Sequence, residues 1–130
     1  MQSQARRVVI TGIGAVTPIG TGREELWQGL RARRSAVGPV TRFDPSPFRS
    51  RIAAEIPDFH PADFMEERRL RRLDRFGQLS IASARLALRD AELDLSLEDR
   101  DQVGAMMGTA LGGVAYAEEQ YPRYMKGGPR

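Results

Sequence analysis

The stretch RVVITGIGAVTPIG, residues 7–20, decides the fold of this chain. It opens with a β-branched run closed by Gly12, which is typical of a buried strand in a parallel sheet. A glycine-rich loop follows. The glycines suggest the dinucleotide-binding fingerprint G-x-G-x-x-G, but Thr17 stands where the third glycine of that fingerprint is expected. Pro18 has no amide hydrogen to donate to a phosphate. The stretch therefore predicts a structural turn from strand to helix, and an α/β fold.

The remaining elements are predicted from capping residues, apolar periodicity and the positions of prolines. Thr21 is expected to cap the first helix, with Glu24 completing a capping box. We expect this first helix to end near Arg33, followed by a short edge strand over residues 51–56. A long helix should begin at Asp63 or Leu70 and end at Ala91. A second buried strand over residues 103–108, a helix over residues 114–125 and a closing loop over residues 127–130 should then follow.

The second half of the long helix, residues 79–91, is apolar on nearly every side. A helix of this kind must be covered from more than one direction. We therefore expect the isolated chain to self-associate or to be poorly soluble.

Composition restricts the chemistry available to the chain. With 130 residues, 41% hydrophobic and 28% charged, it has the size and polarity of one folded domain. It contains no Cys, which excludes disulfides, thiolate metal sites and a cysteine nucleophile within these residues. The lone His60 precedes a proline and is expected to be a surface loop residue. No stretch is long and apolar enough for a signal or membrane segment, so we expect a cytoplasmic protein that does not enter membranes.

Arginines are concentrated before the long helix. Arg68, Arg71, Arg72 and Arg75 have the spacing i, i+3, i+4 and i+7, which predicts one positive helical face. Such a row can pair with carboxylates or phosphates. The alternative is a solvated face partly neutralised by neighbouring acids, namely Glu66, Glu67 and Asp74. Few aromatics are interleaved with these arginines, so nucleic acid is not an expected partner.

Several motifs occur together in an order that resembles one enzyme family. They are RRVVITGIGAVTPIG at residues 6–20, FD at 43–44, LDRF at 73–76, GTALGG at 108–113 and GGPR at 127–130. In this order they resemble the N-terminal part of the elongating, type II β-ketoacyl-acyl-carrier-protein synthases, members of the thiolase-like superfamily. The resemblance covers essentially the whole chain.

The resemblance implies a thiolase-like fold, of which residues 1–130 are an incomplete N-terminal half and a partial domain. The family condenses an acyl chain, held on a cysteine, with malonyl-carrier protein by decarboxylation, and two histidines stabilise the developing charges. None of the three has a counterpart here, and His60 matches neither histidine. We therefore expect no catalytic, metal or cofactor-binding residue in the chain, a stop before the catalytic cysteine, and no condensing activity of the chain alone.

Two features carry over from the family residue by residue. Arg68, Arg71 and Arg72 match basic positions that dock acyl carrier protein. Leu111 matches an apolar position that lines the acyl pocket, although plain core packing is the alternative and both can hold. The implied partners are acyl carrier protein and an acyl thioester, with a homodimer as the assembly of the full-length protein. A non-catalytic reading also remains open: a chain-length-factor-like partner or a carrier-protein-binding module.

Overall fold

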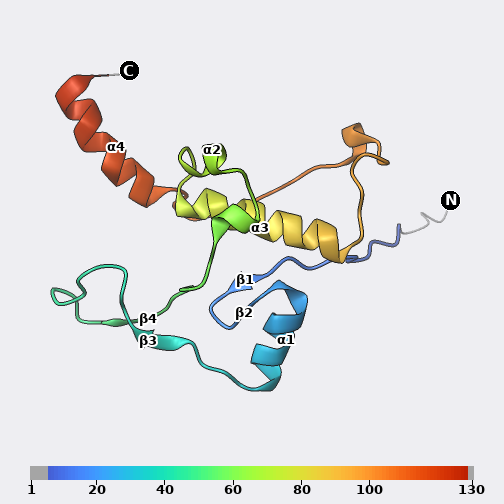
Figure 1. Ribbon diagram of the computed structural model, residues 1–130, viewed down its shortest axis with the longest axis horizontal. Coiled ribbons are helices and arrows are strands. Elements are labelled where there is room, and N and C mark those ends of the chain that lie inside the picture. The colour runs from blue at the N-terminus through green and yellow to red at the C-terminus, as the bar shows by residue number, and fades with distance from the viewer. Residues whose placement is uncertain (1–5, 129–130) are drawn as a thin grey trace.

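The computed structural model describes residues 6–128, which are arranged around one long helix, α3 (Arg75–Asp90) (Figure 1). Asp74 caps this helix, because its Oδ1 accepts a hydrogen bond from the amide of Gly77 at 3.2 Å. At the other end the Ala91 amide still donates to the Ala87 carbonyl, and the next residue, Glu92, has a positive φ of 53° that ends the helix.

A small antiparallel hairpin leads into the first helix. Its strands are β1 (Val16–Thr17) and β2 (Gly20–Thr21), and α1 (Gly22–Arg31) follows directly. Thr21 occupies the N-cap position, but its side chain makes no capping hydrogen bond and Glu24 does not complete the predicted capping box.

Glu25, rather than Glu24, reaches back to the Thr21 backbone. Its Oε2 accepts a hydrogen bond from the Thr21 amide at 2.9 Å. The Glu24 carboxylate instead accepts from Gln28 Nε2 at 2.7 Å, one turn further along the exposed face of the helix. The prediction was one residue out because Gly22, whose φ is 80°, occupies the first helical position and shifts the acid that can reach back.

Gly12 and Gly14 pack directly against the backbone of α3. A Cβ atom on Gly12 would lie 2.6 Å from the Ala91 amide nitrogen, and one on Gly14 would overlap the Ser83 carbonyl oxygen. Only glycine permits such an approach. The two glycines therefore serve helix packing. The predicted turn from strand to helix is replaced by the β1–β2 hairpin, which leads directly into α1.

A second antiparallel hairpin joins β3 (Val37–Pro39) to β4 (Ile52–Ala54), with Val37 opposite Ala54. The predicted edge strand over residues 51–56 is confirmed as β4, in a shorter form. Beyond the hairpin, the Glu55 carboxylate accepts hydrogen bonds from Thr41 Oγ1 at 2.6 Å and from the Thr41 amide at 3.1 Å.

Two short helices precede α3: η1 (Pro61–Asp63) and α2 (Glu67–Leu70). The predicted start of the long helix at Asp63 or Leu70 was wrong. The chain is extended at Asp74, with φ −74° and ψ 170°, because this residue turns out of the helical conformation to cap α3. The buried core lies beside this turn and consists of Phe59, Phe64, Met65 and Ala82.

Neither of the two predicted buried strands is a strand in the described residues. Residues 7–12 and 103–108 have no regular secondary structure, and their apolar side chains are exposed: Val8 is 89%, Ile10 87% and Met106 99% exposed. A strand exists only when a neighbour accepts and donates its backbone hydrogen bonds. Within residues 6–128 the only paired strands are those of the two small hairpins, so the predicted parallel sheet is absent there.

The C-terminal part contains η2 (Arg100–Gln102) and α4 (Val114–Gly127). The predicted helix over residues 114–125 is confirmed, with Pro122 inside it. The expected closing loop is only partly tested, because Gly127 ends α4, Gly128 follows, and residues 129–130 lie outside the described residues. Figure 1 shows α4 extending away from the other elements. None of the helices in residues 6–128 has the length and apolarity needed to cross a membrane.

Candidate functional site

A cluster of arginines lies on α2 and on the link between α2 and α3. Arg68, Arg69, Arg71 and Arg72 are all exposed there, and we call these four residues the basic turn. The prediction of one helical face is wrong, because α2 ends at Leu70 and α3 begins only at Arg75. The positive charge is instead gathered on a short helix and the turn that follows it.

Apolar neighbours orient the basic turn. Leu70 and Leu73 are half-buried and pack against the core cluster that contains Phe64 and Met65. Since these leucines hold the inner side of the turn, Arg71 and Arg72 between them face solvent. The turn therefore directs its charged side chains toward solvent while its apolar side packs against the core.

The neighbouring acids neutralise the basic turn only in part. Glu67 Oε1 lies 3.3 Å from Arg71 Nη2, but both side chains are about four-fifths exposed, so the pair is weak. Among the described residues, Arg68, Arg69 and Arg72 form no ion pair with Glu66, Glu67 or Asp74. Three of the four guanidinium groups of the basic turn can therefore pair with an acidic partner without breaking an existing ion pair.

Arg75 does not belong to the exposed surface. Its Nη2 donates to the Ile56 carbonyl at 2.7 Å, and its guanidinium lies over the Phe59 ring, 5.4 Å from the centroid. Burial, followed by repulsion from Arg42, lowers the pKa of Arg75 from its ordinary value. This arginine fastens the approach to η1 onto the start of α3.

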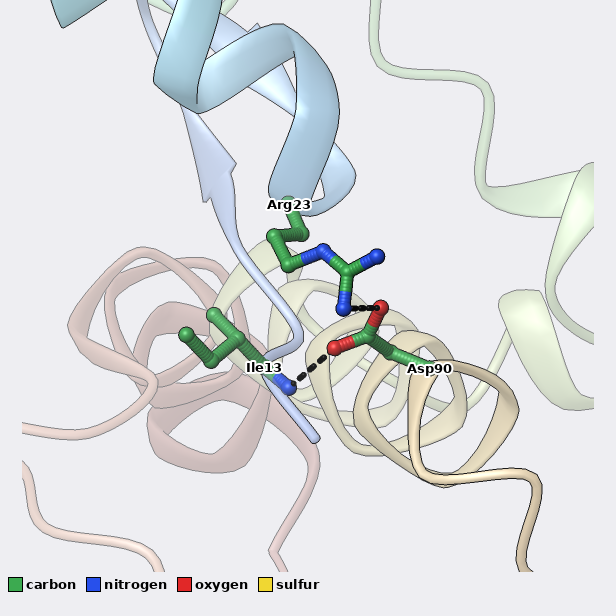
Figure 2. A network of polar contacts seen from close by, with 3 residues as sticks. All are labelled: Ile13, Arg23 and Asp90. Carbon is green, nitrogen blue, oxygen red and sulfur yellow. Dashed lines mark hydrogen bonds and ion pairs between the residues drawn. The ribbon is translucent and has the colours of Figure 1, made fainter. Parts of the chain in front are cut away.

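A second polar network anchors the far end of α3 (Figure 2). Asp90 Oδ1 forms an ion pair with Arg23 Nη1 at 2.9 Å, and Asp90 Oδ2 accepts from the Ile13 amide at 2.9 Å. The Asp90 side chain is only 17% exposed. One carboxylate therefore ties α3 both to α1 and to the glycine-rich stretch, a role that no sequence pattern indicated.

The loop over residues 108–113 reaches the same end of α3 as the basic turn. Its last residue, Gly113, lies so close to Asp74 that an added Cβ atom would be 2.8 Å from Oδ2. Leu111 in this loop is 80% exposed, so it is not a core residue within the described part of the chain. It borders an open hollow of about 500 Å³, together with Val114, Ala117 and Tyr121 of α4.

His60 is exposed and precedes η1, as expected of a loop residue. It lines a hollow of about 360 Å³ with Phe59, Phe64 and Arg34, among others. Across residues 6–128, no three or more His, Asp or Glu side chains are grouped closely enough to hold a metal ion.

The motif order seen in the sequence agrees with a comparison against protein families. A family model described as "Beta-ketoacyl synthase, N-terminal domain" matches residues 5–129, nearly the entire chain. The chain belongs to the β-ketoacyl synthase family. Its fold class is that of an incomplete N-terminal half of a thiolase-like protein.

Individual β-ketoacyl synthase relatives support the same assignment. The chain is 41% identical to 3-oxoacyl-(acyl-carrier-protein) synthase 2 of Coxiella burnetii over 98% of its own length and 31% of the relative's. It is 36% identical to the protein of the same name from Synechocystis, over 97% of the chain and 30% of the relative. A solved structure titled "The ishigamide ketosynthase/chain length factor" matches with a TM-score of 0.75 and 38% identity, covering 95% of this chain and 30% of that one. The chain thus spans less than a third of each of these relatives.

Proposed function

We propose that this chain acts as the N-terminal part of a decarboxylating condensing enzyme, a 3-oxoacyl-acyl-carrier-protein synthase of fatty-acid or polyketide biosynthesis. The observation that carries this proposal is the 41% identity over 98% of the chain to a synthase of that name. The chemistry itself needs a thiolate nucleophile and two charge-stabilising histidines. The chain has no cysteine, and its single histidine is an exposed loop residue, so these groups come from elsewhere in such an enzyme.

The test is a condensation assay with acyl- and malonyl-carrier protein, comparing the longer protein that carries this segment with the 130-residue chain. We expect 3-oxoacyl product from the longer protein and none above the no-enzyme control from the isolated chain. Turnover by the isolated chain would contradict the proposal, because no group in it can hold the acyl thioester intermediate.

The role proposed for the basic turn is docking of acyl carrier protein, a small acidic partner, through Arg68, Arg71 and Arg72. Three observations support this role: the arginines are exposed, the leucines beneath them pack against the core, and the one nearby ion pair is weak. Individual exposed pairs contribute little, but several arginines acting together also steer the approach of an oppositely charged partner. The nearby position of Leu111 at the same end of α3 is compatible with its proposed place along the acyl pocket, where it would meet the chain that the carrier delivers.

The docking role is tested by reversing Arg68, Arg71 and Arg72 together to Glu in the longer protein. We expect carrier-protein affinity to fall by about one to two orders of magnitude at low salt, and the difference to shrink as salt screens the charges. Circular dichroism establishes that the variant is folded. Unchanged low-salt affinity of a folded variant would return these arginines to the role of a solvated surface.

The alternative function is a non-catalytic, chain-length-factor-like partner, or a module that only binds carrier protein. It is favoured by one observation, namely that the solved structure similar to this chain is titled with both a ketosynthase and a chain length factor. A cysteine in a small-residue loop and two later histidines in the longer protein would identify the enzyme. Another residue at the position of that cysteine would identify a non-catalytic, chain-length-factor-like partner. A homodimer and a cytoplasmic location belong to the same proposal and remain predictions.

A further inference from the structure

Gln78 makes two contacts that the proposed function does not yet use. It lies in the first turns of α3, and its half-buried side chain points back toward the basic turn rather than into solvent. Its Nε2 donates to the Leu73 carbonyl at 3.0 Å and reaches the Leu70 carbonyl at 3.4 Å. Both acceptors belong to residues several positions earlier in the chain.

These two carbonyls bracket the part of the basic turn that carries Arg71 and Arg72. Two backbone hydrogen bonds cross the turn: the Arg72 amide donates to the Arg69 carbonyl at 3.1 Å, and the Leu73 amide donates to the Leu70 carbonyl at 3.3 Å. The bond to the Leu70 carbonyl is long and therefore weak, so the backbone holds the Leu73 end of the turn only loosely. The Gln78 amide adds a further connection at this end: its 3.0 Å bond ties the Leu73 carbonyl to a helix of 16 residues, and its weaker 3.4 Å contact reaches the Leu70 carbonyl.

The other polar side chains nearby hold different parts of the structure. Asp74 caps α3, and Arg75 fastens the Ile56 carbonyl and the Phe59 ring. Among the side-chain hydrogen bonds of the described residues, those of Gln78 are the ones that reach the Leu70 and Leu73 carbonyls.

We propose that Gln78 is a positioning residue for carrier-protein docking: its amide fixes the turn that presents Arg71 and Arg72. This inference rests on the docking role proposed above. A turn held in its binding conformation loses less conformational entropy when the partner arrives. Without the Gln78 amide the charges remain, but they are presented by a looser turn.

The experiment uses the longer condensing enzyme and two variants, Gln78→Leu and Gln78→Met. Both side chains have a size close to that of glutamine and neither can donate a hydrogen bond; Met is also flexible enough to fill the same space. The matched control is Gln28→Leu, which removes an amide that donates only to Glu24 on the exposed face of α1. Carrier-protein Kd is measured at several salt concentrations, and kcat and KM are measured with carrier-bound and carrier-free acyl thioesters.

We expect Kd and the KM for the carrier-bound substrate to rise about three- to tenfold, the factor that corresponds to the loss of one ordinary hydrogen bond. The salt dependence of Kd should keep its wild-type slope, because no charge has been removed. Turnover of the carrier-free thioester and the behaviour of Gln28→Leu should be unchanged. Amide hydrogen exchange at Arg72 and Leu73 should become faster in the Gln78 variants.

The outcomes separate this inference from the docking role. If either folded Gln78 variant binds carrier protein as the wild type does, while the triple arginine reversal weakens binding, Gln78 is not a positioning residue and docking stands. If the arginine reversal also has no effect, the docking role itself is wrong. An equal loss of turnover with carrier-bound and carrier-free substrates would assign Gln78 a general structural role and overturn the inference.

Discussion

At the scale of single residues, the ion pair between Glu67 and Arg71 competes with any acidic partner of the basic turn. The two side chains are 81% and 80% exposed, so the pair gains little in water and can be exchanged for another carboxylate. Glu67 also carries negative charge into a surface that is otherwise positive. The effect of the ion pair can be separated from the effect of net charge, because the neighbouring Glu66 forms no ion pair with any residue in 6–128.

Replacing Glu67 with Gln should strengthen binding of acyl carrier protein by about two- to fivefold at low salt, the factor that corresponds to one exposed ion pair. The measurement is a Kd determined by calorimetry or fluorescence anisotropy with the longer protein. Glu66→Gln makes the same change of net charge and should give a smaller gain. Equal gains from the two variants would show that only net charge matters and that the pair does not compete.

At the scale of elements, the β3–β4 hairpin is closed by the Glu55 carboxylate, and this closure should depend on pH. The hydrogen bonds from Thr41 lower the pKa of Glu55 below its ordinary value. Because the pKa is lowered, the ionised Glu55 carboxylate contributes fully to the stability of the closure above the ordinary glutamate pKa of about 4.3. This contribution is lost as pH falls through the lower pKa of the folded state. The Thr41 amide signal should therefore shift on acidification with a midpoint below that of a free glutamate.

The measurement is the chemical shift and hydrogen exchange of the Thr41 amide by NMR across the acidic range. Thr41→Val removes the hydroxyl donor and should move the midpoint back toward the ordinary glutamate pKa. A midpoint already at the ordinary value in the wild type would show that the closure does not form in solution.

Helices were far more predictable from the sequence than strands. Most signals for α1, α3 and α4 are local, since caps and apolar periodicity lie within each helix, and only the boundaries were wrong. The strands expected over residues 7–12 and 103–108 depend on neighbours that pair with them, which no local pattern supplies. The break before Asp74 was missed because the arginine spacing was counted through it as one helix.

In the candidate site, the charged residues were predictable from the sequence, but the contacts that orient them were not. That Arg68, Arg71 and Arg72 are charged and exposed follows from the sequence, whereas the inward direction of Arg75 depends on Ile56 and Phe59, which are distant in the chain. Gln78 gave no signal, because a glutamine in the first turns of a helix is usually an ordinary polar residue.

At the scale of the whole molecule, apolar side chains remain exposed over widely separated segments. The clearest examples are Val8, Ile10, Leu97, Met106 and Leu111, each at least 80% exposed. Apolar surface on this scale drives association when a protein is studied alone. The purified 130-residue chain should therefore sediment as oligomers or aggregates rather than as a monomer.

Analytical ultracentrifugation over a range of concentrations checks this expectation. A detergent series serves as the control, because detergent should dissociate contacts made by apolar surface and leave contacts made by charge. A sharp monomer peak combined with cooperative thermal unfolding would contradict the expectation.

The contact between α3 and the two glycines Gly12 and Gly14 also restricts how the helix can move. Where backbone meets backbone, there are no side chains to change rotamer, and the helix cannot slide along the stretch by small repacking steps. Asp90 pins the last turn of the same helix to Ile13 and Arg23. The helix of 16 residues is about 24 Å long at about 1.5 Å per residue. A partner bound at the basic turn therefore lies at the start of a helix whose far end is held firmly against the glycine-rich stretch.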